Sequence, residues 1–348
     1  ELARAKALID TDELAALQRV GERADRLSMY ATLLDDPDEA RHFDGFASVR
    51  GFKADAETAL LDRVRDLSNL TVLTGSRVEA LIGAPGAPRR ITGVRLTTGE
   101  TYHGAAVLLA AGALHSPRLL QRYLRDSDLA SRLPCAPAVG ANLKLHLLTA
   151  LIAMSPSRKT DLLRKTRILL NDRFPHSSVQ PLGFDSELIA TLVPRLVPRW
   201  IASLVGQRAY GFFLQTEDGS DPRNRVVEGS SGEQPTLDYE AARSGPALAE
   251  HRALIRALRL DLARSGHVSF AERIPPSGTA HACGTLAAGT DPVTSVVDAT
   301  GRVRGLEGLY VVDGSVLSRS SRVNPSLTIY AWSLRVAGQI ALHQRAAA

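Results

Sequence analysis

The sequence predicts a mixed α/β fold in which one sheet-containing domain is assembled from both ends of the chain, around an inserted middle. Three observations predict it. An unbroken apolar run, Val107–Ala111, ends at a glycine and precedes a helical pattern, as expected for a strand buried in a parallel sheet. The stretch from 147 to about 244 is irregular and holds seven prolines. Regular patterns then return, with a helix, a strand at Leu309–Val312 and a terminal helix from Pro325.

The first elements follow from apolar spacing and turn residues. Residues 1–45 carry leucines among charged residues and predict a helical segment. Asp55–Leu67 has an apolar face at helical spacing and predicts an amphipathic helix. Asn69–Ile82 predicts a short β-rich segment with a turn at Gly75, and alternating strands follow around the Thr98–Gly99 turn. These strands lead into the apolar run.

Two helices follow from their end signals. Ser116 as N-cap and Pro117 in the first turn predict a helix that continues to about Arg125. Gly245–Arg264 predicts a longer helix that closes at Gly266.

The last helix has a candidate N-cap, Asn324, and a proline at its first position, Pro325. Its apolar residues recur at helical spacing and predict the stripe that faces the core. That stripe comprises Leu327, Ala331, Leu334, Ala337 and Ile340.

Composition excludes several classes of protein. With 348 residues, 44% hydrophobic and 23% charged, the chain resembles an ordinary soluble globular protein and not a disordered chain, a collagen or a coiled-coil rod. The net charge of +5 is scattered, without the basic runs that bind nucleic acid. Leu188–Val205 is the most apolar stretch, but its two prolines and two arginines exclude a membrane span.

Two cysteines, Cys135 and Cys283, form neither a disulfide framework nor a zinc site, which favours a reducing cytoplasm. The first twelve residues are charged and lack the apolar core of a signal peptide, which agrees with that compartment.

Small residues surround His281 in the sequence TAHACGTLAAGTDP. Because small residues let a flat ligand approach the backbone, this pattern favours a histidine that faces a ligand. A loop histidine bonded to water is the alternative.

Polar groups also gather at the end of one strand and the start of one helix. The strand Leu309–Val312 delivers Asp313 and Gly314 to its carboxyl end, where open α/β sheets bind ligands. The last helix begins with Asn324 and Thr328 beside its unpaired N–H groups, which suit negative charge on a ring system. An ordinary turn and an ordinary helix cap are the alternatives.

Motifs that carry a family resemblance are spread between about residue 50 and residue 345. They are Asn69–Val78, Ala110–Leu120, Val139–His146, Pro235–Tyr239, His281-x-x-Gly284-Thr285, Ser295–Asp298, Gly301–Gly305, Leu309–Ser315 and Asn324-Pro325-x-x-Thr328. Together they resemble the signature of the glucose–methanol–choline (GMC) flavoprotein oxidoreductases.

The resemblance implies FAD as cofactor and oxidation of a small-molecule alcohol, with hydride transfer to flavin N5. It makes His281 the general base that takes the hydroxyl proton. Asn324 would hold the substrate oxygen, and we expect both side chains to reach one hydroxyl in one cavity. The identity of the alcohol, and the choice between an oxidase and an alcohol dehydrogenase, stay open.

The same resemblance implies which residues hold the cofactor. Val78 would meet the adenine, with Ala111 and Gly112 near that end, and Asp313 and Gly314 would contact the ribityl–pyrophosphate part. Asn324, Pro325 and Thr328 would lie at the flavin ring. The sequence implies no metal ligand. The implied architecture is an incomplete FAD-binding Rossmann-like domain (residues 46–146) with an inserted substrate-binding domain (147–240), both completed by residues 241–348.

One part of the family pattern is missing. No G-x-G-x-x-G turn, which binds the FAD pyrophosphate, occurs in the sequence. We therefore expect the 348-residue chain alone to be flavin-free and inactive, and a missing segment, on the same chain or a partner chain, to complete the site. The alternative is a degenerate or partner-subunit module that keeps the fold without flavin.

Overall fold

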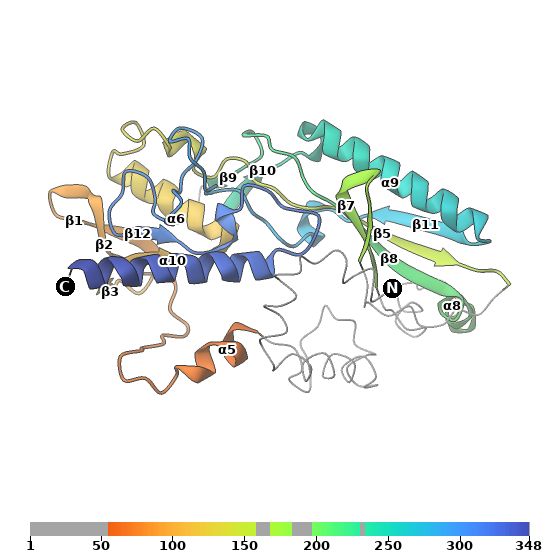
Figure 1. The fold of residues 1–348 in the computed structure, drawn as a ribbon, viewed down its shortest axis with the longest axis horizontal. Coiled ribbons are helices and arrows are strands. Elements are labelled where there is room, and N and C mark those ends of the chain that lie inside the picture. Colours follow the sequence, from red (N-terminus) through yellow and green to blue (C-terminus); the bar gives the residue numbers. More distant parts are fainter. Residues whose placement is uncertain (1–54, 158–167, 183–196, 230–233, 348) are drawn as a thin grey trace. The chain divides into compact units, whose positions relative to one another are not determined.

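The computed structural model describes residues 55–157, 168–182, 197–229 and 234–347 (Figure 1). The chain divides into two compact parts. The first comprises residues 1–72, 153–167 and 181–211, and the second comprises residues 73–152, 168–180 and 212–348. The helical segment predicted over residues 1–45 lies outside the described residues. The boundaries drawn from the sequence at 46–146, 147–240 and 241–348 stay a prediction.

In the first part, the described residues form short helices: α5 (Ala56–Ala59), the 3₁₀ turn η1 (Leu61–Arg63) and α8 (Arg199–Gly206). The single helix predicted over Asp55–Leu67 is therefore wrong. Asp55 does cap α5, since its carboxylate accepts from the N–H of Thr58 at 2.8 Å. The apolar side chains beyond it are exposed, so burial contributes little to a longer helix.

A parallel strand pair forms the centre of the second part. Strand β4 (Val107–Leu109) pairs with β12 (Leu309–Val311), so the two apolar runs, which were predicted to belong to one sheet-containing domain, lie side by side. Leu109 and Leu309 are buried, whereas Leu108 is 45% exposed. The prediction that this run is buried on both faces is therefore wrong, because one face of β4 carries an exposed leucine.

Helix α6 (Gly112–Asp126) begins directly after β4, four residues before the predicted start at Ser116. Pro117 consequently lies inside the helix, where it has no N–H for the carbonyl of Ala113. The hydroxyl of Thr285 donates to that carbonyl at 2.7 Å. A residue far along the chain thus satisfies the acceptor that the proline leaves open.

Helix α10 (Ser326–Ala347) begins one residue after Pro325, whose carbonyl accepts the first helical bond from Ile329. The indole Nε1 of Trp332 donates to the carbonyl of Val311 at 2.9 Å, and the Ser333 hydroxyl donates to that of Val312 at 2.6 Å. Helices α6 and α10 flank β12 in Figure 1.

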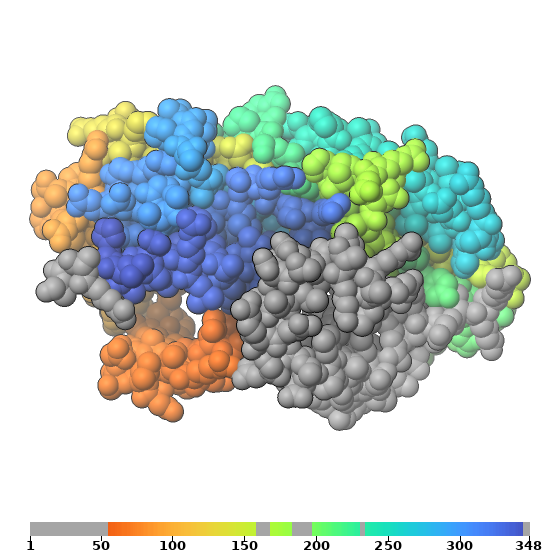
Figure 2. Space-filling view, in the orientation of Figure 1, coloured from red at the N-terminus to blue at the C-terminus, as the bar shows by residue number. Residues whose placement is uncertain are grey.

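These contacts overturn the predicted buried stripe of α10. Leu327 is 82% exposed and Leu334 is 63% exposed, whereas Val336 is fully buried. The helix therefore turns Trp332 and Ser333 toward β12 and leaves the leucines of its apolar stripe at the surface; Figure 2 shows part of the surface of this helix in dark blue.

The described residues also form a five-stranded sheet, with the strand order β11-β5-β8-β7-β6. Its strands are β5 (Leu147–Met154), β6 (Leu169–Asn171), β7 (Phe174–Pro181), β8 (Ala209–Thr216) and β11 (Val268–Arg273). Helix α9 (Gly245–Arg264) packs on it through buried Leu248, His251 and Leu254. The predicted end of α9 is confirmed, since Gly266 adopts φ +81° directly after it.

The remaining strands form two small antiparallel sheets. They are β1 (Val78–Ala84), β2 (Ala87–Leu96) and β3 (Thr101–His103) in one, and β9 (Arg225–Glu228) with β10 (Pro235–Asp238) in the other. Strand β1 begins at Val78, so the predicted β-rich segment starts later than Asn69, although Gly75 turns as expected with φ +67°.

Candidate functional site

A short antiparallel bridge brings two histidines together. Lys144 and Cys283 exchange both backbone hydrogen bonds at 3.0 Å. In an antiparallel register this pairing sets His146 opposite His281, because both lie two residues away in opposite chain directions. Gly284 permits the close approach: it has φ +88°, and a Cβ there would collide with the carbonyl oxygen of Asn142.

The rings of His146 and His281 meet edge to face, with centroids 5.1 Å apart and an interplanar angle of 81°. Their Nδ1 atoms are 3.0 Å apart, which is hydrogen-bond distance. His281 adopts φ +69°, a left-handed conformation that few non-glycine residues take and that is common at functional sites. The candidate base is therefore held in an uncommon backbone geometry with one ring nitrogen engaged.

His146 is buried, and its other ring nitrogen is also engaged. Its Nε2 lies 3.0 Å from the carbonyl oxygens of both Ser320 and Ser321. Burial lowers the pKa of His146, while the bonds to the two carbonyls act in the opposite direction. The ring is thus held neutral between His281 and the segment that leads to α10.

Asn324 lies at the end of that same segment, directly before Pro325. Its Oδ1 is 3.5 Å from the Nε2 of Gln180 on β7, and the neighbouring carbonyl of Arg322 accepts from the Ser178 hydroxyl at 2.6 Å. The segment from Ser320 to Asn324 therefore rests on β7 at one end and on His146 at the other. That His281 and Asn324 touch one substrate hydroxyl stays a prediction.

The Asp313 carboxylate is the centre of a second cluster. One oxygen accepts from the backbone N–H of Gly112 at 2.9 Å and from the Ser116 hydroxyl at 2.5 Å. The other accepts from the N–H and the hydroxyl of Ser315, at 2.9 and 2.5 Å. A carboxylate offers about four acceptor sites, so this side chain is fully engaged within the chain.

This cluster gathers several of the residues predicted to hold a cofactor. Gly112 and Asp313 are directly bonded, and buried Gly314 is close enough to α10 that a Cβ there would lie 3.1 Å from Ile329. Ser116, predicted as a helix cap, instead serves Asp313 and also accepts from the N–H of Ala111 at 3.1 Å. Pro325 is buried at the start of α10, and Thr328 is exposed in its first turn.

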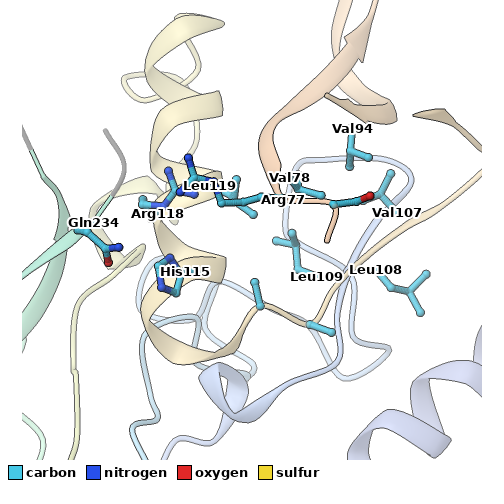
Figure 3. Close-up of a pocket in the computed structure, with 13 residues that line it drawn as sticks. Arg77, Val78, Val94, Val107, Leu108, Leu109, His115, Arg118, Leu119 and Gln234 are labelled. Atoms are coloured by element: carbon cyan, nitrogen blue, oxygen red, sulfur yellow. The ribbon is translucent and has the colours of Figure 1, made fainter. Parts of the chain in front are cut away.

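A cavity of about 570 Å³ opens between the start of β1, strand β4 and helix α6 (Figure 3). Val78 and Ala111, both predicted to lie near an adenine, line it together. Most of its wall is apolar, as is common in small-molecule sites of this size.

The polar part of that wall includes three basic side chains: Arg77, His115 and Arg118. Figure 3 shows His115 and Arg118 projecting from α6 beside Gln234. Burial, followed by the charges of Arg118 and Arg77, lowers the pKa of His115. The cavity thus joins an apolar wall to cationic groups, a combination that suits a flat heterocycle carrying negative charge.

Comparisons with known proteins show the family of the chain. The C-terminal family model described as GMC oxidoreductase matches residues 231–333, and the N-terminal model of the same description matches residues 22–148. The two matches together cover more than half of the chain. The chain belongs to the GMC oxidoreductases.

Two curated GMC relatives match over most of the chain. Pyridoxine 4-oxidase of Microbacterium luteolum is 28% identical over 312 residues, which cover 78% of this chain and 57% of the relative. An uncharacterised GMC-type oxidoreductase of Mycobacterium tuberculosis is 28% identical over 303 residues, or 77% and 45% of the two chains. The chain thus spans about half the length of these relatives.

A third relative, the 6'''-hydroxyparomomycin C oxidase of Streptomyces lividus, is 45% identical over 80 residues, which cover 23% of this chain and 14% of the relative. The high identity is thus confined to a short stretch of both proteins.

Solved GMC structures share the fold. Pyridoxine 4-oxidase from Mesorbium loti matches with a TM-score of 0.62 at 24% identity, over 82% of this chain and 60% of that one. Formate oxidase of Aspergillus oryzae matches with a TM-score of 0.61 at 17% identity, over 81% and 62%. The fold is therefore mixed α/β, these neighbours are GMC oxidoreductases with FAD-binding and substrate-binding domains, and FAD is the cofactor of the family.

Sequence reasoning did not give a role to every residue of this GMC site. His146 stood in a motif with no function assigned. It lies two residues after Lys144, so in an extended strand the two side chains would share one face. Arg77, His115 and Arg118 likewise stood in motifs without an assigned role, because only the fold brings β1 beside α6.

Among the described residues, no group of three or more His, Cys, Asp or Glu side chains could hold a metal ion. Within the described ranges, no helix has both the length and the apolar character to cross a membrane.

Proposed function

We propose that the chain serves a FAD-dependent oxidoreductase that oxidises the CH–OH group of a small alcohol, with His281 as the base. The observation that carries the proposal is the 3.0 Å contact between the Nδ1 atoms of His281 and His146, which orients the ring of the candidate base. FAD, when bound, supplies N5 as the hydride acceptor.

The residues around His281 suit the other tasks of such a reaction. Asn324, at the start of α10, would donate to the substrate oxygen and orient its hydroxyl toward His281. The first turn of α10, with Pro325 and Thr328, presents the positive end of a 22-residue helix to negative charge on a reduced ring. Because the Asp313 side chain is bonded within the chain, its contribution would be to hold Gly112 and Gly314 in place beside the cofactor.

The cavity fits one end of FAD. Its wall joins Val78 and Ala111 to cationic Arg77 and Arg118, so the adenine would lie against the apolar part and negative charge near the guanidinium groups. Ala111 links this cavity to the Asp313 cluster through Ser116. The cofactor would therefore extend from the cavity along Gly112 and Asp313 toward α10.

The cavity and the Asp313 cluster supply no comparable set of donors for the pyrophosphate of FAD. No glycine-rich turn of the required spacing occurs in the sequence, so a set of backbone N–H donors at a helix start must come from a further segment, on the same chain or on a partner. The second candidate function, a flavin-free module of this fold, is favoured by that same absence. The two candidates differ in what happens when the segment is supplied.

The test is flavin content after gel filtration. The full 348-residue chain is expressed alone and, separately, fused behind a strand–G-x-G-x-x-G–helix segment. We expect no flavin in the first protein and near-stoichiometric flavin in the second. Flavin in the isolated chain would contradict the role given to the segment, and a colourless fusion would favour the flavin-free module.

Activity is then assayed with alcohols, beginning with pyridoxine, which names two of the relatives. Replacing the base, His281→Ala, is expected to reduce turnover on the order of a hundredfold. Unchanged turnover would refute the assignment of His281.

We propose the cytoplasm as the compartment, supported by the two cysteines, both free and buried.

A further inference from the structure

The nitrogen of His146 that faces away from His281 is surrounded by acceptors. Two backbone carbonyl oxygens, of Ser320 and Ser321, lie 3.0 Å from Nε2. A carbonyl oxygen can only accept, so Nε2 must carry a hydrogen. The third neighbour is the amide Nε2 of Gln215, 3.3 Å from the same atom; because both carbonyls are closer and can only accept, the Gln215 amide turns over and meets this N–H with its oxygen. The proton of His146 is therefore fixed on Nε2.

A neutral imidazole has only one such proton. His146 is 3% exposed, and burial favours its uncharged form. With the proton on Nε2, its Nδ1 presents a lone pair and can act only as an acceptor.

This lone pair determines the state of the neighbouring ring. The two Nδ1 atoms are 3.0 Å apart, and two lone pairs at that distance would repel each other. His281 must therefore donate from Nδ1, and in its neutral form it keeps its lone pair on Nε2.

We propose that His146 is a positioning residue that holds His281 in the tautomer with a basic Nε2. This inference rests on the proposed function, in which His281 takes the proton of a substrate hydroxyl. Without an acceptor at Nδ1, His281 could place its hydrogen on Nε2 and would then donate to the hydroxyl instead of accepting from it. His146 also orients the ring, because the bond fixes its rotation about Cβ–Cγ.

The same contact serves the charged state of His281. When the hydroxyl O–H bond breaks, its proton binds Nε2 of His281; bound FAD would accept the hydride, which leaves the same carbon with the C–H electron pair. The resulting imidazolium keeps its Nδ1–H directed at the lone pair of His146. His146 thus accepts the Nδ1–H bond of the imidazolium, the role of a carboxylate in other histidine-containing sites, without bringing a negative charge close to the flavin.

The bridge between Lys144 and Cys283 keeps this pair in register. It fixes the backbone on both sides of the contact, and the left-handed conformation of His281 turns its side chain toward His146. Both histidines, the bridge and the carbonyls of Ser320 and Ser321 belong to the same compact part of the chain.

The direct test is the tautomer of His281, read by NMR from a full chain with ¹⁵N-labelled histidine at neutral pH. Its signals are identified by their loss in His281→Gln. We expect a protonated Nδ1 and an unprotonated Nε2. A protonated Nε2 in the wild-type chain would overturn the inference, and this measurement requires neither flavin nor activity.

Two variants of His146 separate positioning from simple support of the fold. His146→Gln keeps an oxygen that can accept from His281 and an N–H group that can donate to the carbonyls, so we expect the wild-type tautomer. His146→Leu has a similar volume and no acceptor, so the Nε2–H form should become the major one. An unchanged tautomer in His146→Leu would contradict the inference.

Turnover of the flavin-loaded fusion distinguishes the failure of this inference from failure of the proposed function. We expect His146→Leu to lower kcat at least about tenfold with a smaller change in KM, and His146→Gln to restore most of it. If His281→Ala abolishes turnover while His146→Leu leaves kcat and the tautomer unchanged, the function stands and the positioning role falls. If the wild-type fusion oxidises no alcohol, the function falls, and the tautomer still reports on the pair.

Discussion

Acid should unfold the second part of the chain by charging one buried histidine, His251 of α9. Its ring bridges β5 and β8: Nε2 is 2.8 Å from the Thr149 hydroxyl, and Nδ1 is 2.8 Å from the Thr216 hydroxyl. The ring is 1% exposed. Burial, followed by the charge of Arg273, lowers the pKa of His251 from 6.5 to about 4.

These hydrogen bonds continue from Thr216 through Ser177 to Glu250, and the carboxylate at that end fixes the donor and acceptor of each bond. The Glu250 carboxylate accepts from the Ser177 hydroxyl at 2.7 Å, so Ser177 must accept from Thr216 at 2.8 Å. Thr216 then accepts from Nδ1–H of His251, and Nε2 accepts from Thr149. A proton added to Nε2 would meet a hydroxyl that already donates to it, so the network favours the neutral ring.

The pKa shift fixes both the sign and the size of the effect. Unfolded His251 binds a proton below about pH 6.5, whereas the folded residue resists it until about pH 4, so stability is lost as pH falls between these values. A difference of about 2.5 pKa units is worth roughly 3 kcal/mol, of which about 2.5 kcal/mol is lost by about pH 4.5.

Urea unfolding at several values between about pH 8 and pH 4.5 measures this loss. The control is His251→Gln, which can still bridge the two threonines and does not titrate. The unfolding free energy of wild type minus that of the variant should fall by about 2.5 kcal/mol over this range. Parallel pH curves for the two proteins would refute the reasoning, because every other titrating group is common to both.

Two further substitutions test the contacts that shape the candidate site. Thr285→Val removes the hydroxyl that satisfies the Ala113 carbonyl beside Pro117 and should lower the unfolding free energy by about 1–3 kcal/mol, whereas Thr285→Ser should restore most of it; equal urea midpoints for the two variants would contradict this. Asp313→Asn places an amide N–H against the N–H of Gly112 or the donors of Ser315, and should cost about 2–3 kcal/mol in the same assay. A wild-type midpoint in that variant would show that the carboxylate is not needed to hold Gly112.

Local patterns predicted the elements whose stability is local or strongly apolar. The placement of Val107–Leu109 and Leu309–Val311 in one sheet-containing domain followed from two apolar runs, and the end of α9 at Gly266 followed from glycine's access to positive φ. The start of α6 at Gly112 was not predicted, because a Ser-Pro pair such as Ser116–Pro117 is typical of a helix start. Only Asp313, distant in sequence, shows that the Ser116 hydroxyl is used elsewhere.

The stripe of α10 shows a second limit. Helical periodicity identifies an apolar face such as Leu327–Leu334, but it does not say which neighbour covers that face. The contact with β12 is instead made by Trp332 and Ser333, which pair their polar atoms with backbone carbonyls. Likewise the sequence placed His281 in a site by its motif, whereas its partner His146 emerged only from the register of the Lys144–Cys283 bridge.

The most direct measurement of the central claim is the bleaching of bound flavin by an alcohol in the absence of oxygen. The flavin-loaded fusion is mixed with a panel of primary and secondary alcohols, and the loss of visible flavin absorbance is followed for wild type and for His281→Gln. We predict that at least one alcohol reduces the wild-type flavin and that the variant is slower on the order of a hundredfold. Flavin that no alcohol in the panel reduces, or that bleaches equally fast in both proteins, would contradict the account.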